Sequence, residues 1–209
     1  MLLKDLIEKN KITEDLLKNV NNKILHNKVR GISSNSKEIK KGYIFVAIKG
    51  KNFDGAEYIA EAEKLGAFLI IAEESCNKKV FSIKKGTARQ IYTLLLSSFY
   101  IKQPKQIIGV TGTNGKTSTV EFCRQLWALA GWKAASMGTL GTKTETAINK
   151  SVYKNKEENL TTFEPSDLYK KLNFLVEEKI SHLALEASSH GIDQYRLDGV
   201  NFSGAVFTN

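Results

Sequence analysis

The chain has 209 residues, a formal net charge of +9, 42% hydrophobic residues and 25% charged residues. This composition is typical of a globular protein and excludes a disordered or fibrous chain, and the length fits two compact units. Among the 31 basic residues, only Arg30, Arg89, Arg124 and Arg196 are arginine. Arginine is the preferred reader of bases and phosphates. The charge therefore indicates a lysine-rich, solvated surface that attracts anionic substrates, and we expect no nucleic-acid partner.

The cysteines and the N-terminal residues indicate a compartment. Cys76 and Cys123 are far apart and outside any metal-ligand spacing, which favours a reducing environment over a disulfide scaffold. Met1-Leu2-Leu3 is followed at once by Lys4 and Asp5, so no signal-peptide core is present, and no apolar run reaches membrane-spanning length. The sequence predicts a cytoplasmic protein without membrane association.

The first part of the sequence predicts a small α/β domain over residues 1–103. Apolar residues recur at helical spacing in three segments, and two continuous apolar runs read as buried strands. The expected helices are 2–7, 58–65 and 87–100, and the expected strands are 43–48 and 67–72. Pro104 stops the last helical pattern, so the boundary to a second domain is expected between 103 and 104.

The second part opens with a phosphate-loop motif, residues 107–119, which read IIGVTGTNGKTST. A β-branched strand leads into a glycine-bracketed loop whose N–H groups can converge on phosphate oxygens, and an amphipathic helix follows and ends near Gly131. Lys116 would bring positive charge to the β- and γ-phosphates, and Thr117 a hydroxyl to Mg²⁺. The expected ATP-binding residues are Gly112, Thr113, Asn114, Gly115, Lys116, Thr117 and Ser118. The alternative is an ordinary glycine-rich turn, since the motif is shortened to GTNGKT.

From residue 104 to 209 the alternation of strands and helices continues and predicts a largely parallel sheet with crossover helices. Pro165 begins a helix, residues 182–187 and 204–208 form strands, and residues 143–159 are expected to be irregular. The sequence stops at Asn209, at the carboxyl end of a strand. Open α/β sheets bind ligands just beyond such ends, so this second domain is expected to be incomplete.

Several motifs, in order, carry a resemblance to a known family. They are GVTGTNGKTST, Thr161-Thr162, Glu164-Pro165, the run 185–196, and the closing 205–209, with 34–37, 42–50 and 54–55 before them. Together they resemble the Mur ligases, and among these the MurE type. Two departures stand out: Asn35-Ser36-Lys37 replaces the family's DSR, and Phe163 replaces the proline of TTPE.

The resemblance implies a function and its partners. The N-terminal domain would bind the uridine part of a precursor, and the second domain would be the N-terminal part of a phosphate-loop ATPase domain. The family uses ATP and Mg²⁺ to convert a carboxylate into an acyl phosphate, which an amine then displaces. The implied enzyme is an ATP-dependent acid–amino-acid ligase that adds meso-diaminopimelate or lysine to UDP-N-acetylmuramoyl-L-Ala-D-Glu in peptidoglycan synthesis for the cell wall, working as a monomer.

The resemblance also assigns residues. Lys116 and Glu186 would be catalytic, and Thr117 and Glu186 would hold the metal. The implied substrate-binding residues are Ser36, Asn52, Thr161, Thr162, Ser188, Gln194 and Arg196. For the serines and threonines, the alternative is helix capping or turn formation. For Glu186 the alternative is a solvated carboxylate at a strand end.

Rival functions stay open at this level. A folylpolyglutamate-synthase-like ligase shares the loop, but that family usually has glycine after the loop lysine, where this chain has Thr117. A non-catalytic nucleotide-binding or UDP-sugar-binding remnant is favoured by the absence of the ATPase segment and third domain that family members carry. For the same reason, the chain alone is expected to be inactive as a ligase. His190 lacks a nucleophile-elbow motif and is expected to be structural.

Overall fold

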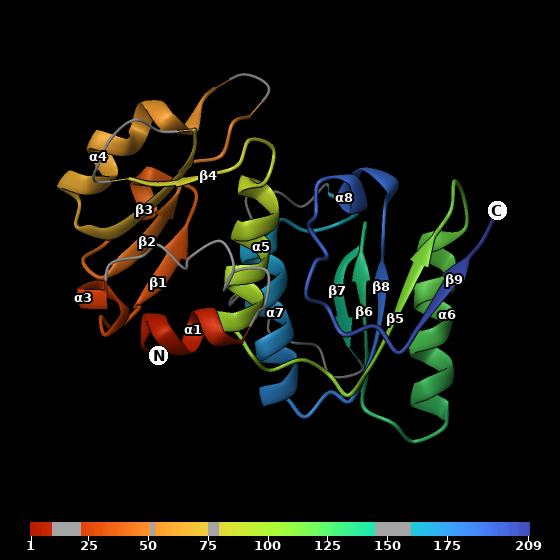
Figure 1. Ribbon diagram of the computed structural model, residues 1–209. Coiled ribbons are helices and arrows are strands. Elements are labelled where there is room, and N and C mark those ends of the chain that lie inside the picture. Colours follow the sequence, from red (N-terminus) through yellow and green to blue (C-terminus); the bar gives the residue numbers. More distant parts are fainter. Residues whose placement is uncertain (10–21, 51–52, 75–79, 145–159) are drawn as a thin grey trace. The chain divides into compact units, whose positions relative to one another are not determined.

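The computed structural model describes residues 1–9, 22–50, 53–74, 80–144 and 160–209 (Figure 1). The chain forms two compact units, Met1–Phe99 and Tyr100–Asn209. This division lies close to the boundary expected between 103 and 104, and independent folding of each part stays a prediction. The α/β class and the largely parallel sheets are confirmed.

The first unit is built on a parallel four-stranded sheet in the order β1-β2-β3-β4. Its strands are β1 Gly31–Ser33, β2 Tyr43–Val46, β3 Ala67–Glu73 and β4 Phe81–Ile83. The central strands β2 and β3 correspond to the two predicted apolar runs. The outer strands were not predicted, because three residues are too few to show a period of two.

Helices cover this sheet and supply its core. They are α1 Leu3–Glu8, α3 Asn22–Leu25, η1 Ser36–Glu38, η2 Gly55–Tyr58, α4 Ile59–Lys64 and α5 Ala88–Phe99. The three predicted helices correspond to α1, to η2 with α4, and to α5. Phe45 and Ile70 from the sheet pack with Ala62 of α4 in one buried cluster. On α5, Ile91 and Leu95 are buried one turn apart, as the helical spacing predicts.

The second unit contains a five-stranded sheet in the order β7-β6-β8-β5-β9. Its strands are β5 Gln106–Thr111, β6 Ala134–Gly138, β7 Gly141–Thr144, β8 His182–Glu186 and β9 Gly204–Phe207. All pairs are parallel except β6 with β7. The predicted strands 107–110, 182–187 and 204–208 are confirmed. β6 was missed because its alanine, serine and glycine residues give no apolar pattern. β7 was not predicted either, and the irregular structure expected over 143–159 is wrong at Lys143 and Thr144, which pair with β6; residues 145–159 lie outside the described residues.

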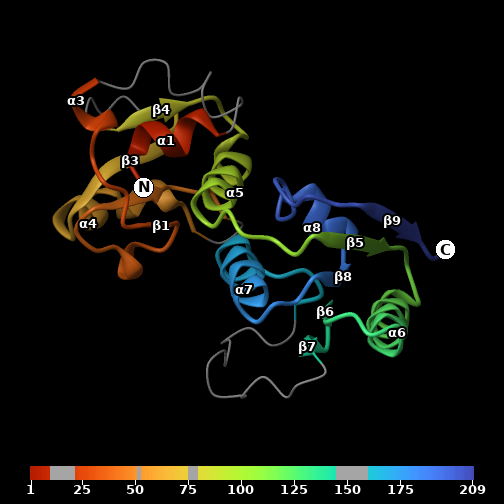
Figure 2. The same ribbon diagram turned by 90° about the horizontal axis from the view of Figure 1, so that it is seen from below.

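The described residues of this unit form three helices: α6 Lys116–Leu129, α7 Pro165–Glu177 and α8 Ser189–Asp193. Figure 2 shows α6 and α7 on opposite faces of the sheet. Pro165 occupies the first turn of α7, where its missing N–H costs nothing. Gly131 follows the C-cap of α6 with φ +83°, which confirms the predicted end of that helix.

Parallel pairing brings four chain segments to one edge of the second sheet. Val110 of β5 is in register with Glu186 of β8, and Thr111 with Phe207 of β9. The phosphate loop after β5, Thr139 after β6, Glu186 at the end of β8 and the residues after β9 therefore share the carboxyl edge. Within the part of the chain that the structure describes, no helix has the length and apolar character to cross a membrane.

Candidate functional site

The phosphate loop, residues 112–118, joins β5 to α6 with two glycines at positive φ. Gly112 has φ +132° and Gly115 has φ +82°, conformations that other residues adopt only under strain. Gly115 is the N-cap of α6 and carries no side chain that could accept a hydrogen bond. The first-turn N–H groups of α6 thus lack intrahelical partners and, with the helix dipole, favour an anion.

The Lys116 side chain lies along the loop. Its Nζ donates to the carbonyl oxygens of Gly112 at 2.6 Å and Thr113 at 3.0 Å. The ammonium therefore lies beside the loop backbone that leads into the first-turn N–H groups of α6. This geometry fits the predicted role of the lysine as a charge placed beside bound phosphates.

Glu121 of α6 connects this helix to the sheet through hydrogen bonds. The Glu121 carboxylate accepts hydrogen bonds from Arg124, from Gln125 at 3.0 Å and from Ser136 of β6 at 2.9 Å. The hydrogen bond from Arg124 is the main cause that lowers the pKa of Glu121 from 4.5 to about 2. An ionised Glu121 therefore holds the first half of α6 against β6.

Glu186, at the end of β8, is 1% exposed. Its Oε1 accepts the Thr139 N–H at 3.0 Å, and its Oε2 accepts the Thr139 hydroxyl at 3.2 Å. A side chain at Gly138 would clash with the carboxylate, so the tight approach requires glycine there. Glu186 is thus a buried and oriented group, unlike the solvated strand-end carboxylate that was the alternative. Thr139 was not predicted as a site residue, because β6, the strand directly before it, consists mostly of small residues that give no apolar pattern.

Thr161, Thr162 and Ser188 are brought together beside Glu186. The Thr161 hydroxyl lies 3.2 Å from the Thr139 hydroxyl. The Thr162 Oγ1 accepts the Ser188 N–H at 2.9 Å and donates to the Glu186 carbonyl at 3.2 Å. Ser188 also accepts the Gly191 N–H at 3.1 Å as N-cap of α8, so the capping alternative holds for this residue as well.

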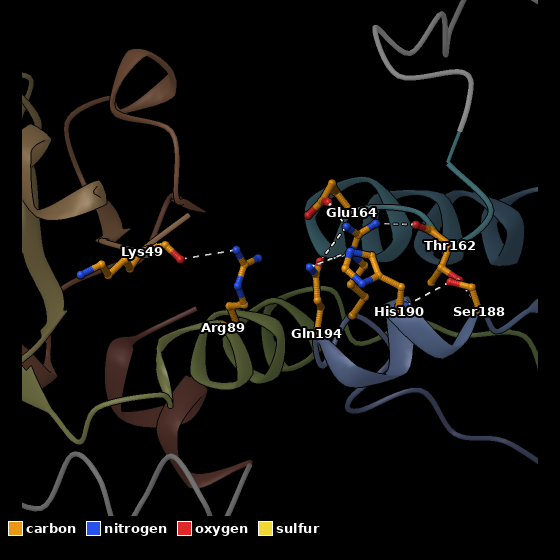
Figure 3. A network of polar contacts seen from close by, with 9 residues as sticks. Lys49, Arg89, Thr162, Glu164, Ser188, His190 and Gln194 are labelled. Carbon is orange, nitrogen blue, oxygen red and sulfur yellow. Dashed lines mark hydrogen bonds and ion pairs between the residues drawn. The ribbon is translucent and has the colours of Figure 1, made fainter. Parts of the chain in front are cut away.

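Arg196 is buried at 8% exposure and forms the centre of a second polar network. Its Nη1 donates to the Thr162 carbonyl at 2.9 Å, its Nε and Nη2 donate to the Gln194 Oε1 at 3.1 and 2.8 Å, and its Nη2 lies 2.8 Å from the Glu164 carboxylate. Thr162, Glu164 and Gln194 converge in Figure 3, with His190 bonded to Gln194. The guanidinium therefore holds the backbone of the Thr161-Thr162 segment. Glu164 was missed because the partner that gives it this role is distant in sequence.

In the first unit, Ser36 is buried in η1 and Asn52 lies outside the described residues. Asn35 Oδ1 accepts the Lys37 N–H at 3.1 Å as N-cap of η1. Asparagine and aspartate cap helices equally well, so the departure at Asn35 preserves this local structure. In the same unit, Arg89 Nη2 donates to the Lys49 carbonyl at 3.5 Å (Figure 3).

Comparison with known proteins identifies both units. Residues 110–209 match the Mur ligase middle domain, and residues 28–97 match the catalytic domain of the Mur ligase family. The chain belongs to the Mur ligase family. The resemblance expected from the sequence motifs is thereby confirmed.

Relatives of known function refine the comparison. The UDP-N-acetylmuramoyl-L-alanyl-D-glutamate–2,6-diaminopimelate ligase of Brucella melitensis is 41% identical over 184 residues, which cover 87% of this chain and 36% of the relative. The ligase of the same name from Rhizobium meliloti is 42% identical over 185 residues, with the same coverage. The chain thus spans about 36% of the length of these curated relatives.

Solved structures show the same fold. A UDP-N-acetylmuramoyl-L-alanyl-D-glutamate–2,6-diaminopimelate ligase superposes with a TM-score of 0.76 at 23% identity, over 100% of this chain and 40% of its own. MurF from Acinetobacter baumannii gives a TM-score of 0.54 at 18% identity, over 93% of this chain and 39% of its own.

Proposed function

We propose that the chain is the precursor-binding and nucleotide-binding part of an ATP-dependent ligase of the MurE type. The reaction would join meso-diaminopimelate or lysine to the D-glutamyl carboxylate of UDP-N-acetylmuramoyl-L-Ala-D-Glu. One observation carries this proposal. The phosphate loop and the oriented carboxylate of Glu186 stand at the carboxyl ends of two neighbouring strands, β5 and β8. The names of the relatives at 41% and 42% identity support the substrate class.

The residues of the loop fit ATP. Positive φ at Gly112 and Gly115, the first-turn N–H groups of α6 and the Lys116 ammonium together make an anion site for phosphates. Thr113, Asn114, Thr117 and Ser118 complete the proposed ATP-binding set. When bound, ATP would supply the phosphoryl group that activates the carboxylate for attack by an amine.

The donor set also fits Mg²⁺. This ion prefers oxygen ligands and commonly binds one or two protein groups together with phosphate oxygens and water. In the described ranges, His, Cys, Asp and Glu side chains form no cluster of three or more that could hold a metal by themselves. The Thr117 hydroxyl and the Glu186 carboxylate are the proposed protein ligands, and Thr139 orients the carboxylate for that task.

The precursor would be bound by the remaining predicted residues. The hydroxyl groups of Thr161, Thr162 and Ser188 lie at the same sheet edge, where that of Thr162 is bonded to Ser188 and to the Glu186 carbonyl, and Gln194 adds an amide. Such a set suits the several oxygen atoms of a sugar diphosphate. Because the guanidinium of Arg196 is committed to protein groups, its proposed contribution is to hold Thr162 in place. Ser36 and Asn52 are the proposed uridine contacts of the first unit.

The proposal is tested by nucleotide binding. Lys116→Ala removes the ammonium from the anion site, and we expect it to weaken Mg-ATP binding at least about tenfold, the loss of one strong charge-assisted interaction. Isothermal titration of the chain with Mg-ATP measures the effect. Lys102→Ala is the matched control, because it removes an exposed ammonium of the same unit, one that lies 3.3 Å from the Glu177 carboxylate and outside the loop. Equal affinities in the wild type and Lys116→Ala would reject the loop as the nucleotide site.

A further inference from the structure

The end of β9 contacts the phosphate loop directly. The Thr208 N–H donates to the Thr111 carbonyl at 2.9 Å and so extends the β5–β9 pairing beyond Phe207. The Thr208 hydroxyl lies 3.1 Å from the Thr111 carbonyl and 2.6 Å from the Asn114 carbonyl. One side chain therefore bridges the beginning and the tip of the loop.

The Thr208 hydroxyl also fills the space beneath Gly112. A side chain at position 112 would clash with the Thr208 Oγ1 and would lie 3.1 Å from the Asn209 nitrogen. Gly112 is thus required twice, by its φ of +132° and by the closeness of Thr208. The path of the loop and the identity of residue 208 are matched to each other.

Asn209 contacts the same loop tip by accepting hydrogen bonds from its N–H groups. Its Oδ1 accepts the Thr113 N–H at 2.9 Å and the Asn114 N–H at 3.0 Å. Asn209 therefore pairs two successive N–H groups at the tip, and Thr208 pairs the Asn114 carbonyl. The donors left for an anion are those of the first turn of α6.

We propose that Thr208 and Asn209 are positioning residues that hold the phosphate loop in its anion-binding conformation. The inference rests on the proposed function in one respect, that the loop binds a nucleoside triphosphate. A glycine-rich loop has many accessible conformations, and a ligand that must order it binds less tightly than one that meets it already ordered. The contacts of this pair order the tip before the nucleotide arrives.

The test compares four variants of the chain by isothermal titration with Mg-ATP. Thr208→Val keeps the shape and the strand propensity but removes the hydroxyl, and Asn209→Ala removes the acceptor for two N–H groups. Each is expected to weaken Mg-ATP binding about tenfold, the effect of about one lost hydrogen bond and the unpaired groups it leaves. Thr208→Ser restores the hydroxyl and is expected to restore affinity to within about twofold.

The fourth variant, Ser203→Ala, is a matched structural control. Ser203 Oγ accepts the Ile107 N–H at 3.4 Å, so it also joins β9 to β5 by a hydroxyl, but at the far end from the loop. The melting temperature of every variant is measured alongside. A merely structural role predicts that Ser203→Ala and Thr208→Val lower the melting temperature and the affinity together, and that result would overturn the proposal.

The two proposals fail in different ways. Mg-ATP binding by Thr208→Val and Asn209→Ala at wild-type strength, with Lys116→Ala still defective, would overturn the positioning role and leave the nucleotide site intact. A wild-type chain that does not bind Mg-ATP would overturn the proposed function and this inference with it.

Discussion

The two units use the same kind of parallel sheet but differ in how they cover it. In the first unit, the large exposed apolar side chains are scattered, at Leu2, Phe53, Tyr58 and Leu65. In the second unit, several of them lie on one helix, α6. Phe122, Leu126 and Leu129 follow one another at helical spacing along α6 and are 62%, 64% and 86% exposed.

β9, an edge strand of the second unit, is also exposed. All four residues of β9 are exposed, and Phe207 is 74% exposed. Large apolar side chains exposed along one element favour packing against other protein. The first unit therefore keeps its large apolar side chains mostly buried. In the second unit, α6 and β9 expose apolar side chains of the kind that are usually buried.

The largest expected effect separates buried from exposed aromatic residues. Phe45, in the core of the first unit, is 0% exposed, whereas Phe207 is 74% exposed. We expect Phe45→Ala to lower the free energy of unfolding of its unit by about 3–5 kcal/mol, and Phe207→Ala to change it by less than about 0.5 kcal/mol. Urea titration followed by circular dichroism measures both. Similar losses in the two variants would contradict the contrast between a closed core and an open face.

An intermediate effect on stability concerns Glu121, whose hydrogen bonds connect α6 to β6. Glu121→Gln is expected to cost about 1.5–3 kcal/mol at pH 7, because it removes the charge from the hydrogen bond with Arg124. The pKa in the folded protein is about 2 and the ordinary value is 4.5, so the carboxylate stabilises the folded state above pH 4.5. That contribution is lost as the pH falls from 4.5 toward 2.

The acid dependence provides the decisive readout for Glu121. The wild type should lose stability more steeply than Glu121→Gln between pH 4.5 and about 2 in chemical denaturation at fixed ionic strength. Parallel curves for the two proteins would show that Glu121 is not held ionised by its partners. Gln125→Ala is a useful comparison, since it removes a neutral donor to the same carboxylate.

The smallest expected effect concerns affinity at the sheet edge. Lysine cannot reproduce the forked contacts of Arg196 with Thr162, Glu164 and Gln194, because its ammonium is a single point of charge. We expect Arg196→Lys to weaken binding of the UDP-N-acetylmuramoyl dipeptide about tenfold, or about 1.4 kcal/mol, with Mg-ATP affinity unchanged. Titration with each ligand separately measures this. A loss confined to Mg-ATP would assign the network to the nucleotide instead.

The sequence predicted the parts of the fold that leave a local pattern. The apolar runs of β2 and β3 and the glycine-bracketed loop after β5 are contiguous in the chain, so their chemistry is visible in a short window. β6 left no such signal, because its burial depends on neighbours and its residues are small. Without β6, Thr139 and its hydrogen bonds to Glu186 could not be predicted.

The proximity of several predicted site residues followed from the sequence, whereas their roles stay predictions and their contacts could not be foreseen. Thr161, Thr162, Ser188 and Glu186 meet at one edge, as the family motifs implied. The contacts of Arg196 with Glu164 and with the Thr162 carbonyl could not be predicted, because these partners are distant in sequence and their spacing follows no periodicity; Thr162 is 34 residues away. Tertiary contacts of this kind decide whether an arginine binds a ligand or supports the residues that do.

The pairing of β5 with β9 has a consequence for the order of events during synthesis. The Thr208 hydroxyl and the Thr111 carbonyl that meet at the phosphate loop are 97 residues apart in the chain. On the ribosome, the loop and α6 emerge long before the strand that completes their sheet edge, and contacts across such separations form slowly. Throughout that interval the side of β5 that will receive β9 is unpaired and open to other chains, and the docking of β9 moves the open edge of the sheet to β9 itself.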